Sequence, residues 1–208
     1  MNISNIVKKK VVDSLFRLFK KNNILKLTGC LVLIIIILFA FLGIIPQMEK
    51  ETDLKNINSQ GKSGNVLVIY HPGLSSFQED VTYSFVKGLV ERDYAIEITT
   101  SSSKTTTDIS KYDLIVLGMP TYGGGLAKPM ENYLARIDDL EGKKVVIIIT
   151  GAGSTDESVT NMKEFIAMRN GYIIESLPLW SMKPNEDVYG INDATEIAYN
   201  SALNLQLS

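Results

Sequence analysis

The sequence is poor in residues that commonly bind metals or perform covalent catalysis. Its 208 residues include one cysteine, Cys30, and one histidine, His71. A single cysteine excludes an internal disulfide. With one histidine and no cysteine, the C-terminal part can form neither a Cys-His dyad nor a histidine-rich metal site. A Ser-His-Asp triad would have to use His71, and no GxSxG motif accompanies it. The sequence therefore predicts no catalytic side chain and no metal site.

Basic residues are scarce in the larger, C-terminal part of the chain. Residues 63–208 carry eleven Lys and Arg against nineteen Asp and Glu, a net charge of -8. Residues 1–62 have the opposite balance, with ten basic and four acidic residues and a net charge of +6. Nucleic-acid binding needs a basic face, so the acidic part argues against a nucleic-acid partner. It suits a small-molecule site or a docking surface for a basic protein.

Residues 27–45 contain no charged side chain. A helix of this length spans roughly 28 Å, at a rise of about 1.5 Å per residue, and the hydrocarbon core of a bilayer is about 30 Å thick. The segment is therefore predicted to be a single transmembrane helix that contacts the lipid bilayer. A cleaved signal peptide fits less well, because the apolar run is long and no A-x-A-like site follows it. Cys30 resembles a lipidated bacterial cysteine. The apolar run follows it instead of preceding it, however, which favours a small residue within the helix.

The segments that flank this helix differ in charge. Residues 1–26 are basic and amphipathic, and they either lie on an anionic membrane surface or form a partly ordered tail. After the helix, Lys50 and Lys55 are balanced by acidic residues. The positive-inside rule therefore predicts a single-pass protein of the cell membrane, with a cytoplasmic N-terminus and an extracytoplasmic C-terminal domain. Residues 46–64 are polar, lack a hydrophobic period and are predicted to be a flexible linker.

Residues 65–208 alternate between strand-like and helix-like patterns. Three apolar runs predict central strands: 66–70, 113–118 and 144–150. Two further segments, 94–100 and 172–179, predict neighbouring strands. Apolar residues at helical spacing predict four helices: 79–92, 126–137, 157–168 and 193–205. No helical pattern links Thr100 to Asp113. This order predicts an α/β fold with a doubly wound, five-stranded parallel sheet. The absence of GxGxxG after the first strand disfavours a classical NAD-binding fold.

Ligands of such sheets bind at the carboxyl ends of the strands, which directs attention to three loops. The first contains Ser75 and Ser76 at the start of a helix, where backbone N–H groups can bind an anion. The second has three consecutive glycines after Tyr122. They suit either close approach to a flat ligand or a flexible turn with a surface tyrosine. The third, residues 150–156, is TGAGSTD, whose polar residues could face a bound ring or simply cap the next helix.

The C-terminal part resembles the flavodoxin-like FMN-binding proteins. The resemblance lies in a strand, a loop and a helix start, followed by the segments DLIVLGMPTYGGGLAKPMENYL and KKVVIIITGAGS. The resemblance covers residues 65–208. It implies that FMN is the cofactor, that the first loop holds its phosphate, and that the other two loops hold its isoalloxazine ring. Carried over by position, the cofactor-binding candidates are His71, Gly73, Leu74, Ser75 and Ser76 in the first loop, Pro120, Thr121, Tyr122, Gly123 and Gly124 in the second, and Gly151, Ala152, Gly153 and Ser154 in the third.

The first loop departs from the family pattern. It lacks the asparagine of the usual Gly-Asn-Thr element, Phe77 stands near the expected threonine, and Pro72 has no N–H to donate. His71 could add charge to a phosphate in mild acid, or it could be a solvated loop residue. Together with the predicted transmembrane helix, the resemblance implies a membrane-anchored protein that acts with FMN in electron transfer, with a redox protein partner, or in flavin-dependent reduction of a small substrate. The alternative is a binding or scaffold module whose flavin site has decayed.

Overall fold

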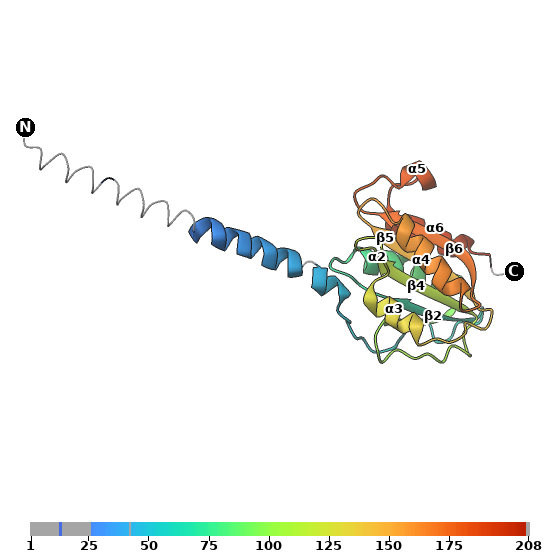
Figure 1. Cartoon of the computed structure of the whole chain (residues 1–208). Helices are drawn as coiled ribbons and strands as arrows, with labels where there is room; N and C mark the ends of the chain where they lie inside the picture. The colour runs from blue at the N-terminus through green and yellow to red at the C-terminus, as the bar shows by residue number, and fades with distance from the viewer. Residues whose placement is uncertain (1–12, 14–25, 42, 207–208) are drawn as a thin grey trace, which may run out of the picture. The chain divides into compact units, whose positions relative to one another are not determined.

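The computed structural model describes residues 13, 26–41 and 43–206 (Figure 1). It divides into two compact units, Met1–Ile45 and Pro46–Ser208. The helix Lys26–Gln47 is long and apolar enough to cross a membrane, and none of its most apolar stretch is buried. Apart from residues 13 and 26, the predicted basic amphipathic segment 1–26 lies outside the described residues.

A six-stranded sheet forms the centre of the second unit, with the strand order β1-β3-β2-β4-β5-β6. Five of these strands run parallel: β2 (Asn65–Tyr70), β3 (Ala95–Thr100), β4 (Leu114–Pro120), β5 (Lys144–Gly151) and β6 (Tyr172–Trp180). They are the five predicted strands. The sixth, β1 (Lys55–Asn56), pairs antiparallel with β3. The predicted number of strands was therefore wrong, because the segment thought to be a linker contributes one.

Helices cover both faces of the sheet. On one face lie α2 (Phe77–Glu91) and α6 (Ala194–Asn204), and on the other lie α3 (Lys128–Ala135) and α4 (Asp156–Ala167). Each strand sends alternate side chains into the two cores. In β2, for example, Val66 and Val68 join the first core, whereas Leu67 and Ile69 join the second. All four are fully buried, which explains why the central strands are apolar throughout.

Two connections complete the domain. The link from Thr100 to Leu114 contains no helix, as predicted. A four-residue helix, α5 (Glu186–Tyr189), precedes α6 and had no helical signal in the sequence. The chain enters the domain through a short 3₁₀ turn, η1 (Ile45–Gln47), whose Pro46 is buried.

The segment 46–64 packs on the domain, contrary to the prediction of a flexible coil. After β1, the Ile57 N–H donates to Ile96 O (3.0 Å) and Asn58 Nδ2 donates to Tyr94 O (3.0 Å). Gly61 lies so close to this edge that an added Cβ would be 2.3 Å from the carbonyl carbon of Tyr94. The open edge of β3 offers backbone hydrogen-bond partners to a polar chain, and pairing covers that edge.

Candidate functional site

The three loops singled out from the sequence meet at the carboxyl edge of the sheet, because β2, β4 and β5 are adjacent strands. We call them loop 1 (residues 71–76), loop 2 (121–127) and loop 3 (152–155). Backbone hydrogen bonds join their starting points. The His71 N–H donates to Gly118 O (2.8 Å), and the Thr121 N–H donates to Thr150 O (2.7 Å). The structure thus brings the predicted site residues to one edge of the fold.

Loop 1 leads into a helix whose first N–H groups have no partner in the described part of the chain. Ser76 is the N-cap of α2 and makes no side-chain capping bond. Within the described residues, the backbone N–H groups of Ser75, Ser76, Phe77 and Gln78 have no acceptor. Ser75 and Ser76 are exposed. Unpaired N–H groups at the positive end of a helix dipole attract an anion.

The amino end of α6, unlike that of α2, is capped by a side chain. The Asp193 side chain accepts hydrogen bonds from the N–H groups of Thr195 (2.8 Å) and Glu196 (3.3 Å). A carboxylate of the chain itself therefore satisfies the amino end of α6. The amino end of α2 has no such cap, so its donors are available to a ligand.

Gly73 packs loop 1 against loop 2. Its φ is +75°, in the left-handed region that favours glycine. An added Cβ would lie 2.7 Å from both Pro120 Cγ and the Tyr122 hydroxyl. That hydroxyl also accepts the N–H of Leu74 (2.8 Å). Pro120 is the buried last residue of β4 and supports Gly73.

His71 is a buried structural contact. Its side chain is 2% exposed, and Nε2 lies 2.6 Å from Pro46 O. A carbonyl only accepts, so Nε2 carries the proton and donates it. The other ring nitrogen, Nδ1, is buried and has no hydrogen-bond partner among the residues that the structure describes. Burial lowers the pKa of His71, outweighing the opposite effect of its hydrogen bond to Pro46. The reading of a solvated loop residue was wrong, and burial opposes the positive charge expected toward a phosphate.

Loop 2 takes a conformation that needs glycine and is held by α4. Gly123 and Gly124 have φ values of +66° and +86°. The hydroxyl of Ser158 in α4 hydrogen-bonds to the Thr121 hydroxyl and lies 2.8 Å from Gly124 O. The Glu157 carboxylate lies against Gly124, where an added Cβ would be 2.0 Å from Oε2. Loop 2 is therefore a fixed turn, and the half-exposed Tyr122 bridges it to loop 1.

Loop 3 is the most exposed of the three. Gly151 ends β5, and an added Cβ there would lie 2.8 Å from Thr121 Cγ2. Ala152, Gly153 and Ser154 are exposed, and Ala152 O accepts the N–H groups of Met182 (2.9 Å) and Lys183 (3.1 Å). Within the described residues, no side chain caps α4. The helix-cap explanation for the polar residues of loop 3 is therefore wrong.

Sequence reasoning missed Gln78, which ties α2 to the sheet beneath the loops. Its side chain is 1% exposed; Oε1 accepts the Thr150 hydroxyl (2.7 Å), and Nε2 donates to the Thr82 hydroxyl (3.0 Å). An added Cβ on Gly118 would lie 2.7 Å from Gln78 Nε2. An available signal was a polar residue one turn before Thr82, on the face of α2 that carries the buried Val81 and Phe85.

Gln47 was likewise not predicted, because no motif includes it. Its Oε1 accepts the N–H of Lys128 (2.7 Å), the first residue of α3, which directly follows loop 2. The two residues are 81 positions apart. Together with the contact between Pro46 and His71, this bond brings the chain entry into the surroundings of the site.

Comparison with known proteins agrees with this fold. A family model described as a flavodoxin domain matches residues 83–178. Solved structures with a similar fold include oxidised Flavodoxin 2 from Bacillus cereus, with 23% identity and a TM-score of 0.57 over 68% of this chain and 97% of that one. Two-electron reduced flavodoxin from Megasphaera elsdenii has 18% identity and a TM-score of 0.53 over 66% and 98%. An azoreductase from Bacillus anthracis str. Sterne has 12% identity and a TM-score of 0.53 over 67% and 99%.

Among curated proteins, none matches the sequence of this chain. At identities below 25%, the structural likeness concerns the fold. The predicted flavodoxin-like α/β fold is confirmed, with a parallel sheet of five strands and one added antiparallel strand.

Proposed function

Taking the flavodoxin-like domain as the premise, we propose that the protein binds FMN and acts in electron transfer or flavin-dependent reduction. The observation that carries this proposal is the uncapped amino end of α2 at the carboxyl edge of the sheet. The N–H groups of residues 75–78 and the hydroxyls of Ser75 and Ser76 would hold the phosphate. The residues of loops 2 and 3 would hold the isoalloxazine ring. When bound, FMN supplies the redox chemistry.

The residues of loop 1 can hold a phosphate, but they offer fewer hydrogen-bond donors than the family pattern does. Pro72 has no N–H, and the Leu74 N–H is already bound to Tyr122. Glu79 and Asp80 in the first turn of α2 oppose a negative ligand. Four unpaired N–H groups and two exposed hydroxyls remain, which is a sufficient set for a phosphate.

The chain's own side chains have positioning roles in this scheme. Tyr122 joins loop 2 to loop 1 through the Leu74 N–H. Ser158 holds the turn at Gly124, and Gln78 fixes α2 against Thr150. These contacts reduce the movement of the loops before a ligand arrives, which lowers the entropy cost of binding.

Flavin binding by the purified full-length protein tests the proposal. We expect its absorbance spectrum to show a flavin, or to show one after FMN is added. Replacing both Ser75 and Ser76 by alanine should raise the Kd for FMN about tenfold, which corresponds to about 1.4 kcal/mol. Ser110→Ala is the matched control, because its exposed hydroxyl bonds Asp108 in the segment that precedes β4. A wild-type protein that stays colourless with added FMN would contradict the proposal.

The second candidate is a binding or scaffold module with a decayed flavin site. It is favoured by the missing donor at Pro72 and by the Leu74 N–H, which is bound to Tyr122. The same flavin titration separates the two functions. If FMN binds, turnover of a quinone with a nicotinamide donor would distinguish a reductase from an electron carrier. An acidic domain further suggests a redox protein partner with a basic surface.

We also propose that residues 27–45, within the helix Lys26–Gln47, anchor the protein in the cell membrane as a single pass, with a cytoplasmic N-terminus and an extracytoplasmic domain. The support is its length and composition and the charge difference between its flanks. A signal sequence near the N-terminus has similar properties. We expect protease added to intact cells to digest the domain, and the mature protein to keep its N-terminal residues by mass spectrometry. A fully protected domain would contradict the topology.

A further inference from the structure

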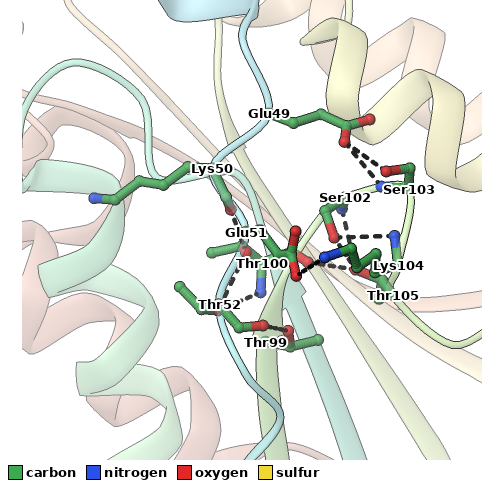
Figure 2. Close-up of polar contacts among 10 residues, drawn as sticks. All are labelled: Glu49, Lys50, Glu51, Thr52, Thr99, Thr100, Ser102, Ser103, Lys104 and Thr105. Carbon is green, nitrogen blue, oxygen red and sulfur yellow. Dashed lines mark hydrogen bonds and ion pairs between the residues drawn. The ribbon is translucent and has the colours of Figure 1, made fainter.

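The segment from Pro46 to Asn56, which we call the strap, binds along the domain through a continuous series of contacts. The Glu49 carboxylate accepts the N–H (3.0 Å) and the hydroxyl (2.9 Å) of Ser103. Figure 2 shows this pair beside the ion pair of Glu51 with Lys104 (2.9 Å). The strap then continues into β1, which pairs with β3.

The middle of the strap is fixed to the end of β3. The Thr52 hydroxyl lies 3.1 Å from that of Thr100 and accepts the Thr100 N–H (3.2 Å). Thr52 O accepts the Thr99 hydroxyl (3.0 Å), and Lys50 O accepts the Thr100 hydroxyl (Figure 2). Main-chain and side-chain atoms of the strap both take part, so it is bound in one register.

The first two residues of the strap contact the surroundings of the candidate site. Pro46 O accepts His71 Nε2, and His71 begins loop 1. Gln47 Oε1 accepts the N–H of Lys128, which begins α3 directly after loop 2. Ala127, the N-cap of α3, has no side chain that could do this.

Both contacts satisfy donors that would otherwise be left unpaired. His71 is buried and its Nδ1 already lacks a partner, so the Pro46 carbonyl is the one acceptor its ring has within the described residues. Loss of that acceptor would leave a buried N–H unsatisfied and favour movement of loop 1. Loss of Gln47 would loosen the first turn of α3 and with it the end of loop 2.

We propose that Pro46, Gln47 and His71 are positioning residues of the cofactor site, so that the site is complete only with the strap in place. This inference rests on the proposed binding of FMN at loops 1 and 2. These residues act through the loops and do not touch the cofactor themselves. The segment that connects the apolar helix to the domain is then part of the binding site's support, and displacing it lowers FMN affinity.

The test uses the full-length protein in detergent and three variants. Gln47→Ala and His71→Ala each remove one contact between the strap and the site. His71→Gln keeps a donor that can reach Pro46 O. The matched control is Glu49→Ala, which cuts the strap at Ser103 and leaves both site contacts intact. The measurements are the Kd for FMN, hydrogen exchange of the loops without FMN, and the melting temperature.

We expect Gln47→Ala and His71→Ala to raise the Kd for FMN about tenfold and to speed exchange over residues 73–77 and 121–128, because supporting residues of a site commonly have effects of this size. His71→Gln should recover part of the affinity. Glu49→Ala should change exchange near Ser103 and leave the Kd within about twofold.

Unchanged exchange in the loops of Gln47→Ala and His71→Ala, with an unchanged Kd, would overturn the inference. If His71→Ala does not fold, Gln47→Ala alone decides, because it removes the contact with Lys128. An equal loss of affinity in Glu49→Ala would overturn it too, since it would reflect general destabilisation. If the wild type binds no FMN, the proposed function fails. Exchange without FMN still decides whether the strap positions the loops.

Discussion

At the scale of single residues, His71 shows how burial changes a role that its residue type suggests. Histidine beside an anion site is commonly read as a source of positive charge. Here desolvation lowers its pKa, and its one hydrogen-bonded ring nitrogen binds a backbone carbonyl. Lys50, the charged group that acts on it, lowers the pKa further. His71 is therefore neutral at neutral pH and serves as a donor to Pro46.

His71 should make the stability of the domain depend on pH. Its folded pKa lies below the ordinary histidine value of 6.5, so the unfolded chain takes up the proton first as the pH falls. The free energy of unfolding is therefore highest above about pH 6.5. It decreases as the pH falls from there to the folded pKa, and it is constant below that pKa. We expect thermal unfolding at about pH 7.5 and about pH 5 to differ less in His71→Gln than in the wild type. The same pH dependence in both proteins would exclude His71 as its cause.

At the scale of elements, the two helices on one face of the sheet differ at their amino ends. Asp193 caps α6 with hydrogen bonds to two N–H groups, whereas α2 has no side-chain cap. A helix end without a cap lowers stability unless water or a ligand satisfies it. The open end of α2 lies at the carboxyl edge of the sheet, which is the edge where a ligand is expected.

Removal of the α6 cap should destabilise the domain without affecting the site. Asp193→Ala is expected to lower the free energy of unfolding by about 1 kcal/mol, or the melting temperature by about 2–4 °C. Hydrogen bonds from the hydroxyl and N–H of Thr195 lower the pKa of Asp193. The cap therefore stabilises the fold when the pH is above the ordinary aspartate pKa of 3.8, and this contribution is lost as the pH falls through the folded pKa.

The control for this change is Asp187→Ala in α5, whose carboxylate makes no hydrogen bond within the described part of the chain. Chemical denaturation of both variants measures the difference. An Asp193→Ala protein as stable as Asp187→Ala would show that the cap contributes little.

The elements also show what a sequence can and cannot reveal. The strands β2, β4 and β5 were predictable, because a strand buried on both faces is apolar at every position. Their carboxyl ends then located the three loops. β1 was not predictable, since Lys55 and Asn56 are exposed and polar. The contacts of Pro46 with His71 and of Gln47 with Lys128 cross 25 and 81 residues, and no local pattern encodes such distant pairs.

At the scale of the whole molecule, the folded domain begins near Pro46, at the end of the apolar helix. The sequence suggested a free linker of nineteen residues between the two parts. In the structure these residues cover the edge of β3 and contact His71, the first residue of loop 1. An exposed strand edge would otherwise be open to pairing with another chain.

Shortening the chain from its N-terminal side should show that the folded domain begins near Pro46. A protein that starts at Gly64 loses β1 and the acceptor of His71, whereas one that starts at Pro46 keeps both. We expect the shorter protein to melt at least about 5 °C lower, because it loses several hydrogen bonds and exposes an edge strand. Size-exclusion chromatography should also show more self-association. Equal melting temperatures for the two proteins would place the strap outside the cooperative fold.

The strap's contacts follow one another in chain order, and this order has a mechanical consequence. From its N-terminal end the chain first meets His71 at Pro46, then Lys128 at Gln47, then Ser103 at Glu49, and last the ladder of β1 with β3. Tension applied from the N-terminal side would load these bonds in that sequence. The two bonds beside loops 1 and 2 would rupture first and the edge strand last, so a pull on the strap would reach the candidate site before it unfolded any strand.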